Sequence, residues 1–455
     1  MTETKLALEN EQKFLVEHAK MAKKANRIDP SLFDFYNAKR GLRNEDGTGV
    51  LVGLTEIGSV HGYIVDEKEK VPVDGSLHYR GINIFDLVTG FISGGRFGFE
   101  ESVYLLLFGK LPTAKEFEEF LSVMEIHREV EDVFIDTILK APSRNVMNKL
   151  ARSVLTLYSF DRNPEGRSMK TVLRQCLTMI AKFPSILAYA YQAKSHYYDR
   201  KSLFIHRPLA GLSTAENFLR LIRPDGKFTK VEAETLDLAL VLHAEHGGGN
   251  NSTFTTHVVS SSDTDVFSSI AAAIGSLKGL KHGGANIKVA EMFDNIKDNV
   301  KDWNDEGEVA SYIEKIIKKE AFNKTGLVYG MGHAVYTKSD PRAIVLKKKV
   351  EELVAEKDRQ KEYNLYQNVE KVTPGVFAEV KGSDKVISAN VDFYSGFVYD
   401  MLGIPRDLYT AIFAMARIAG WSAHLIEEMV SGGRIIRPAY KSVSKPKDYT
   451  DIKTR

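Results

Sequence analysis

The chain has 455 residues, enough for the hydrophobic cores of two or three domains. Its hydrophobic content of 43% and charged content of 27% are typical of a soluble globular protein. The 62 basic and 60 acidic side chains give a formal charge of +2, which excludes a chain-wide positive field for nucleic acid. The single cysteine, Cys176, excludes an intramolecular disulfide and a cysteine-based zinc site, and it fits a reducing compartment.

The first 27 residues mix Glu and Lys at helical spacing. They lack the apolar core of a signal peptide and the Arg/Ser-rich bias of a transit peptide. No uninterrupted apolar run approaches the ~20 residues that span a bilayer. We therefore expect a cytoplasmic protein without a membrane partner.

Apolar residues recur at three/four spacing along most of the chain, which predicts a mainly α fold. The segments with this pattern are 99–108, 116–126, 172–193, 231–246, 266–280, 289–300, 308–319, 341–356 and 408–430. Alternating β-branched runs are confined to about 50–73, where they predict one or two small hairpins.

A Lys/Glu-dense segment runs from about residue 288 to 385, between more apolar stretches. Charge runs of this kind usually form solvated helix faces. The composition predicts a large domain over 1–287 with an N-terminal extension, and a small inserted domain over 288–396. Residues 397–455 then return to the large domain and end in a basic arm.

The loop from Gly330 to Arg342 combines a Gly-x-Gly turn, His333 and an arginine nine residues further on. Glycine lets a backbone approach a ligand closely. Asp340-Pro341 is typical of a helix N-cap and first helical residue, which would put Arg342 in the first turn. An imidazole and a guanidinium in one pocket suit a carbonyl substrate with a carboxylate. A surface turn with a solvated histidine is the alternative.

Two histidines three residues apart, His243 and His246, precede a run of glycines that should end their helix. They could begin a metal site, with Glu245 or His257 as a third ligand. The spacing is not the His-Glu-x-x-His of metalloproteases. A histidine that interacts with the last carbonyls of its helix is the commoner arrangement, and we expect no metal here.

Three further residues stand in unusual contexts. His282 lies beside two glycines at a predicted helix junction, and Asp392 lies among apolar and aromatic residues at a helix start. A structural histidine and an N-cap are the simpler interpretations of each. Arg417 lies within an apolar helix, where an uncompensated charge is costly, so it needs an anionic partner. Together these residues indicate acid–base chemistry on a small polycarboxylate.

At these residues the chain resembles the citrate synthase family. The matching motifs, in the family's order, are HAEHGGGN, GLKHGGAN, GMGHAVYTKSDPR, NVDFYSG, FAMARIAGW and IIRP. Weaker matches, EESVYLLLFGKLPT and IAKFPSILA, extend the resemblance over nearly the whole chain from about Gly53. The resemblance implies a two-domain helical homodimer that condenses acetyl-CoA, as co-substrate, with oxaloacetate. It implies no permanently bound cofactor.

Carried over residue by residue, the resemblance gives the conserved roles of the family to particular side chains. Asp392 would be the base that removes a proton from the acetyl methyl group. His282 would stabilise the enol or enolate oxygen, and His333 would polarise and protonate the oxaloacetate carbonyl. The residues expected to bind oxaloacetate or line its site are His246, Arg342, Arg417, Phe413 and, from the other subunit, Arg437.

Binding of CoA is expected at Lys385 and at the backbone of Gly330 and Gly332. Many relatives carry a basic residue shortly after the loop histidine, where this chain has Ala334 and Thr337. Lys338 is a candidate replacement.

Three other functions stay open on the sequence. A 2-methylcitrate synthase would use the same residues with propionyl-CoA, because a methyl group changes binding by only ~1–3 kcal/mol. A histidine-based metallohydrolase would need His243, His246 and another ligand. A non-catalytic helical scaffold would leave Arg417 without a purpose.

Overall fold

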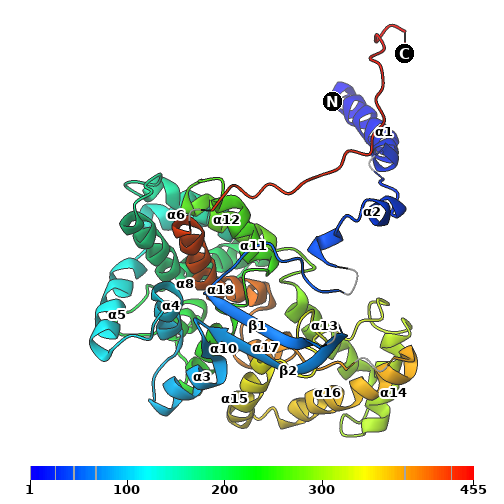
Figure 1. Cartoon of the computed structure of the whole chain (residues 1–455). Helices are drawn as coiled ribbons and strands as arrows, with labels where there is room; N and C mark the ends of the chain where they lie inside the picture. Colours follow the sequence, from blue (N-terminus) through cyan, green and yellow to red (C-terminus); the bar gives the residue numbers. More distant parts are fainter. Residues whose placement is uncertain are drawn as a thin grey trace. The chain divides into compact units, whose positions relative to one another are not determined.

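The computed structural model describes residues 2–25, 27–44, 47–66, 69–383, 386–431 and 433–454, and it is mainly α-helical as predicted (Figure 1). The chain divides into two compact units, residues 1–54 and 55–455. None of the helices in the described residues is long and apolar enough to cross a membrane. The predicted division at 288 and 396 is a different one and stays a prediction.

In its described part, the first unit contains one long helix and two short ones. Its helices are α1 (Thr2–Ala25), α2 (Ser31–Phe35) and η1 (Arg40–Leu42). The described side chains of α1 from Gln12 onwards are exposed, including Phe14 and Val16. The described side chains of α1 form no core among themselves.

The second unit begins with a small antiparallel sheet of order β1-β2-β3. The strands are β1 (Gly58–Asp66), β2 (Glu69–Tyr79) and β3 (Ile82–Asn83). Gly58 pairs with Tyr79, and the register shifts between His61 and Tyr63. The predicted hairpin is therefore present, but it runs past residue 73, because the pairing with β1 holds the polar second half of β2 extended.

The helices of the second unit follow in chain order. They are α3 (Ile84–Ser93), α4 (Phe99–Phe108), α5 (Ala114–Arg128), α6 (Asp132–Lys140), α7 (Val146–Leu157), η2 (Tyr158–Phe160), α8 (Met169–Asp199), α9 (Thr214–Ile222), α10 (Lys230–His243), α11 (Asn251–Ser260), α12 (Val266–Leu277), α13 (Ala285–Asn299), α14 (Glu306–Ile317), α15 (Pro341–Lys357), α16 (Gln360–Lys381), α17 (Val391–Met401), η3 (Arg406–Leu408) and α18 (Tyr409–Val430). Several begin with capping boxes, as Thr113 and Glu116 do at α5.

The core forms around α8, a helix of 31 residues that is buried along most of its length. Helices α5, α6, α7, α9 and α18 pack against it. A second group joins α14 to α16, and α13 and α15 to α17 (Figure 1). Helices α10 and α18 also contact members of this second group. These contacts bring together three parts of the chain: the segment after α10, the loop before α15 and the first turn of α17.

One predicted boundary is wrong at the site itself. The pattern predicted a helix over 231–246, but α10 ends at His243. Gly247, with φ of 82°, takes a left-handed backbone conformation that favours glycine. His246 therefore lies in the turn after the helix.

Candidate active site

The predicted site residues come from six separate places in the second unit. His246 follows α10, His282 lies between α12 and α13, and His333 lies in the loop before α15. Arg342 and Asp392 lie in the first turns of α15 and α17. Phe413 and Arg417 lie on one face of α18.

Hydrogen bonds tie the His333 loop to the segment that leads into α17. The amide of Gly332 donates to Ser388 O at 2.7 Å, and that of Asn390 donates to Gly330 O at 2.8 Å. The Asn390 side-chain amide donates to Gly332 O at 2.8 Å. Gly330 has a φ of 81°, and a Cβ there would lie 2.9 Å from the backbone of Phe393. The turn thus requires glycine and brings His333 near the start of α17.

The loop also fixes the tautomer of His333. Its Nδ1 accepts the backbone N–H groups of Val335 at 3.0 Å and Tyr336 at 3.2 Å. A neutral ring in this position carries its proton on Nε2. Burial, and then the positive charge of Arg342, lower the pKa of His333 to about 4. At neutral pH the side chain is a neutral hydrogen-bond donor, and its ring centre lies 5.3 Å from that of His246.

Arg342 is held by Asp340, which the sequence identified only as an N-cap. The carboxylate caps α15 by accepting the Arg342 N–H at 2.9 Å. It also accepts from Nε at 3.0 Å and from Nη2 at 2.8 Å. Its second oxygen accepts the Val391 N–H at 3.2 Å, so Asp340 joins α15 to α17. Arg342 is 4% exposed, and Tyr336 lies beneath its guanidinium.

Arg417 is fully buried, as its apolar helix predicted, and among the described residues neither terminal nitrogen of its guanidinium is bonded to a carboxylate. Its Nε donates to the backbone oxygen of His243 at 2.8 Å. Within the described residues, its Nη1 and Nη2 have no hydrogen-bond partner, and neither does Nε2 of His246. A buried guanidinium left in this state costs several kcal/mol. An anionic ligand would supply the missing acceptors.

Asp392 is the second residue of α17 rather than its cap. Asn390 is the N-cap, and its side chain accepts the Asp392 N–H at 3.0 Å. The N-cap interpretation of Asp392 is therefore wrong. Burial raises the pKa of Asp392 to about 6, against the attraction of Arg342. A carboxylate with this pKa can accept a proton near neutrality.

His282 lies across the same region. Its Nε2 is 3.0 Å from Ser252 Oγ, which also accepts the Trp421 indole N–H at 3.2 Å. Burial, and then Arg417, lower the pKa of His282 to about 4, so this imidazole is also neutral at pH 7. The ring of Phe413 lies 6.4 Å from that of His282 and 4.7 Å from the Arg417 guanidinium carbon.

One predicted residue that the structure describes is not part of this cluster. Arg437 is exposed in the extended segment that follows α18. Lys385 lies outside the described residues. The structure adds Ser252, which lies outside the quoted motifs, and gives new roles to Asp340 and Glu245, which the sequence suggested only as an N-cap and a possible metal ligand. Glu245 accepts the Gly247 N–H, and this bond shapes the turn that carries His246.

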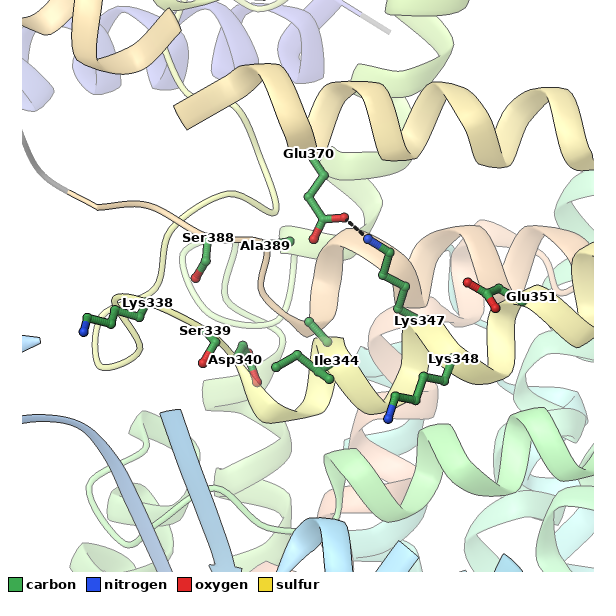
Figure 2. A pocket seen from close by; sticks show the side chains of 11 residues that line it. Lys338, Ser339, Asp340, Ile344, Lys347, Lys348, Glu351, Glu370, Ser388 and Ala389 are labelled. Atoms are coloured by element: carbon green, nitrogen blue, oxygen red, sulfur yellow. Dashed lines mark hydrogen bonds and ion pairs between the residues drawn. The ribbon is translucent and has the colours of Figure 1, made fainter. Parts of the chain in front are cut away.

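A pocket of about 290 Å³ adjoins the segment from Lys338 to Asp340 and the first turns of α15 (Figure 2). It is lined by Lys338, Ser339, Asp340, Ala343, Ile344, Lys347, Lys348, Glu351, Glu370, Ser388 and Ala389. Lys347 is paired with Glu370 at 2.5 Å, and Figure 2 shows the Lys338 side chain directed away from both.

Among the described residues, the ligand atoms of the metal site considered from the sequence do not converge. His243 directs Nδ1 at Ala239 O, 2.8 Å away, within its own helix. In the described part of the chain, the group whose ligand atoms converge is a different one, His257, His424 and Glu427.

This geometry is typical of one class of protein, an enzyme that acts on a small anion. Its site combines neutral imidazole donors, a carboxylate base and buried guanidinium groups that can bind the anion. The family model for the citrate synthase C-terminal domain matches residues 46–439. The citrate synthase of Haloferax volcanii is 34% identical over 426 residues, which cover 92% of this chain and 99% of that protein. The chain belongs to the citrate synthase family, and it is an acyltransferase of that type.

Two more relatives bear on the substrates. A ternary complex of carboxymethyl coenzyme A and oxaloacetate with the citrate synthase of Thermoplasma acidophilum has a TM-score of 0.74 and 28% identity. The match covers 91% of this chain and 98% of that one. A 2-methylcitrate synthase of Corynebacterium glutamicum is 31% identical over 387 residues, covering 83% of this chain and 92% of that protein. The family thus identifies the condensation in general, and both citrate synthases and 2-methylcitrate synthases occur among the relatives.

Proposed function

We propose that this chain condenses acetyl-CoA with oxaloacetate to give citrate and free CoA. The observation that carries the proposal is the buried, unsatisfied guanidinium of Arg417 beside His246 Nε2. A dicarboxylate with a keto group offers the acceptors that these nitrogen atoms lack. Arg342, already oriented by Asp340, provides a second cation for the same ligand.

In this mechanism Asp392 removes a proton from the methyl carbon of acetyl-CoA. That carbon is a very weak acid, so the enolate oxygen must be stabilised as it forms. His282 donates the hydrogen bond, which is worth roughly 3–4 kcal/mol if it acts as an oxyanion-hole donor. Because this imidazole is neutral, it can donate a hydrogen bond to the enolate oxygen and does not transfer a proton to Asp392 before the reaction begins.

The orientation of His282 depends on Ser252. For the ring to donate from Nδ1, its Nε2 must accept a hydrogen, and Ser252 Oγ lies within 3.0 Å. The Trp421 N–H occupies one acceptor direction of that hydroxyl, which leaves the hydroxyl hydrogen for Nε2 or for Asn250 Oδ1 at 2.9 Å. We assign the hydrogen to His282 when substrate is bound.

The new carbon nucleophile attacks the keto carbon of oxaloacetate, and His333 transfers its Nε2 proton to the developing alkoxide. Water then cleaves the thioester of the condensation product and releases CoA. Closure of residues 288–396 over the remainder of the second unit would exclude water until that step. We also propose a homodimer in which Arg437 completes the partner's site, a cytoplasmic location, and Gly330, Gly332, Lys385 and Lys338 as contacts for CoA.

Propionyl-CoA is the second candidate, on the strength of the 2-methylcitrate synthase relative. Initial rates of free-thiol release from acetyl-CoA and propionyl-CoA, each with and without oxaloacetate, separate the two. We expect oxaloacetate-dependent release and a kcat/KM at least about tenfold higher for acetyl-CoA, the value of one methyl group in a fitted pocket. A higher value for propionyl-CoA would reassign the substrate, and release that ignores oxaloacetate would refute the condensation. Asp392→Ala is the inactive control.

A further inference from the structure

Two histidines face each other on packed helices outside the cluster of catalytic candidates. His257 lies on α11 and His424 on α18, and these two helices are in contact. Nε2 of His257 and Nδ1 of His424 are 3.2 Å apart. His424 is fully buried, whereas the His257 side chain keeps 14% of its surface exposed. None of the proposed reaction steps uses either ring.

A carboxylate holds the outer nitrogen of each ring. Glu428 Oε2 lies 2.8 Å from Nδ1 of His257, and Glu245 Oε1 lies 3.0 Å from Nε2 of His424. A ring nitrogen that faces a carboxylate carries the hydrogen. While both rings are neutral, the two inner nitrogens direct lone pairs at each other across 3.2 Å, so either a proton on His424 or a metal ion must lie between them. Carboxylate–imidazole–metal chains have this geometry in protein metal sites.

Glu427 supplies a third ligand atom. Its Oε1 accepts the Glu56 N–H at 2.8 Å. Its Oε2 lies 3.7 Å from Nδ1 of His424, and it is buried without a hydrogen-bond partner in the described part of the structure. The three ligand atoms lie within 4.8 Å of one another. A proton on His424 would satisfy His257 but leave Glu427 Oε2 unpaired, whereas a metal ion would satisfy all three.

The spacing and the charge favour a divalent transition metal. Tetrahedral zinc with bonds of about 2.0–2.1 Å places its ligand atoms roughly 3.3 Å apart, close to the observed 3.2 and 3.7 Å. Three carboxylates, those of Glu245, Glu427 and Glu428, surround the two imidazoles. We propose that His257, His424 and Glu427 bind one divalent cation of the zinc class, with the fourth position open to solvent.

The site lies against the turn that follows His246. A side chain at Gly248 would lie 3.6 Å from His257 Nε2 and 3.5 Å from His424 Cε1, so the turn passes directly beside both rings. A bound cation would stiffen this turn and raise the stability of the fold without taking part in the condensation. The proposal does not rest on the proposed function, because cation binding and turnover are measured separately.

Untagged protein, stripped with a chelator and transferred to chelator-free buffer, tests the site. Titration with zinc ions in a calorimeter should give one equivalent and a higher thermal midpoint. Cobalt ions should give the visible absorption of a tetrahedral complex. His257→Gln and Glu427→Gln should weaken zinc binding at least a hundredfold. Glu428→Gln, which removes only an orienting carboxylate, should weaken it by about 10–100-fold.

The exposed His61 on β1 provides a matched control, and His61→Gln should bind zinc as the unaltered chain does. Circular dichroism and the thermal midpoint of the stripped variants establish that each remains folded. Zinc affinity unchanged by both His257→Gln and Glu427→Gln would place the metal elsewhere and overturn the proposal. A stripped chain that binds no zinc at millimolar concentration would leave a shared proton between the rings and overturn it as well.

Discussion

The ionised carboxylate of Asp392 should destabilise the folded protein, and this cost can be measured. Burial raises its pKa from the ordinary 3.8 to about 6. Each pKa unit corresponds to about 1.4 kcal/mol, so the charged form costs about 3 kcal/mol. The carboxyl is partly exposed, and its charge at the start of α17 gains about 0.3–1 kcal/mol from the helix dipole. Solvent screening at this partly exposed carboxyl reduces the remainder further, to a net cost of about 1–2 kcal/mol.

The sign of the pH dependence follows from the direction of this shift. Below pH 4 the carboxyl is protonated in both the folded and the unfolded chain, and it imposes no cost. Between pH 4 and 6 the unfolded chain loses its proton first, so the folded state becomes progressively less favoured. Above pH 6 the penalty is complete.

Asp392→Asn keeps the shape of the side chain and removes the charge. The variant should melt about 1–2 °C higher than the unaltered chain at pH 7.5, given ~2.1 cal/mol/K of unfolding entropy per residue. The difference should vanish near pH 4. Turnover should fall at least about a hundredfold, because the amide cannot act as the base. Scanning calorimetry of substrate-free protein from pH 4 to 8 measures the melting temperatures, and the rate of thiol release measures the turnover.

An exposed aspartate on α13 is the control for a general charge effect. Asp298→Asn should show no increase in melting temperature that is confined to pH values above 6. If Asp392→Asn melts at or below the unaltered chain at pH 7.5, the reasoning from burial is wrong. An increase in melting temperature that grows toward acidic pH would also contradict this reasoning, because a raised pKa destabilises the folded chain only at higher pH.

His282→Ala should lower kcat by about 10²–10³, the loss measured for one oxyanion-hole donor, and a folded variant with near-normal turnover would remove His282 from this role. Arg417→Ala should raise KM for oxaloacetate at least about thirtyfold, with a smaller change for acyl-CoA, because a buried charge-assisted contact is worth 2–5 kcal/mol. Steady-state kinetics with each substrate varied in turn give the two KM values. An equal increase in KM for oxaloacetate and for acyl-CoA would contradict the assignment of Arg417 to oxaloacetate. Co-expressed heterodimers of Asp392→Ala and Arg437→Ala chains should recover about half of the normal activity, since one of the two sites has both intact residues. Tag-selected heterodimers without activity would show that Arg437 serves its own subunit.

The sequence alone determined the helical class and most helix positions. Periodic apolar faces depend on local spacing, which the chain order contains directly, so α4 and α15 begin where the pattern begins. Local chemistry also fixed the start of α15, because an aspartate before a proline caps a helix whatever surrounds it. The burial of Arg417 followed from its apolar neighbours along the helix.

The end of α10 and the N-cap of α17 could not be predicted from the apolar pattern of their own segments. The left-handed turn at Gly247 ends the hydrogen bonding of α10 before His246, although the apolar pattern continues to that residue. At α17 the pattern offered Asp392 as the cap. Asn390 caps the helix while its amide also holds the His333 loop.

Only the tertiary structure decided which side chains meet. Ser252 and His282 are 30 residues apart, and His257 and His424 are 167 apart, yet each pair lies within hydrogen-bonding distance. The same is true of the perturbed pKa of Asp392, which results from water excluded by several helices together. Motif resemblance can name such residues one by one. Their distances, tautomers and unpaired atoms arise from packing between remote segments, which no local spacing encodes.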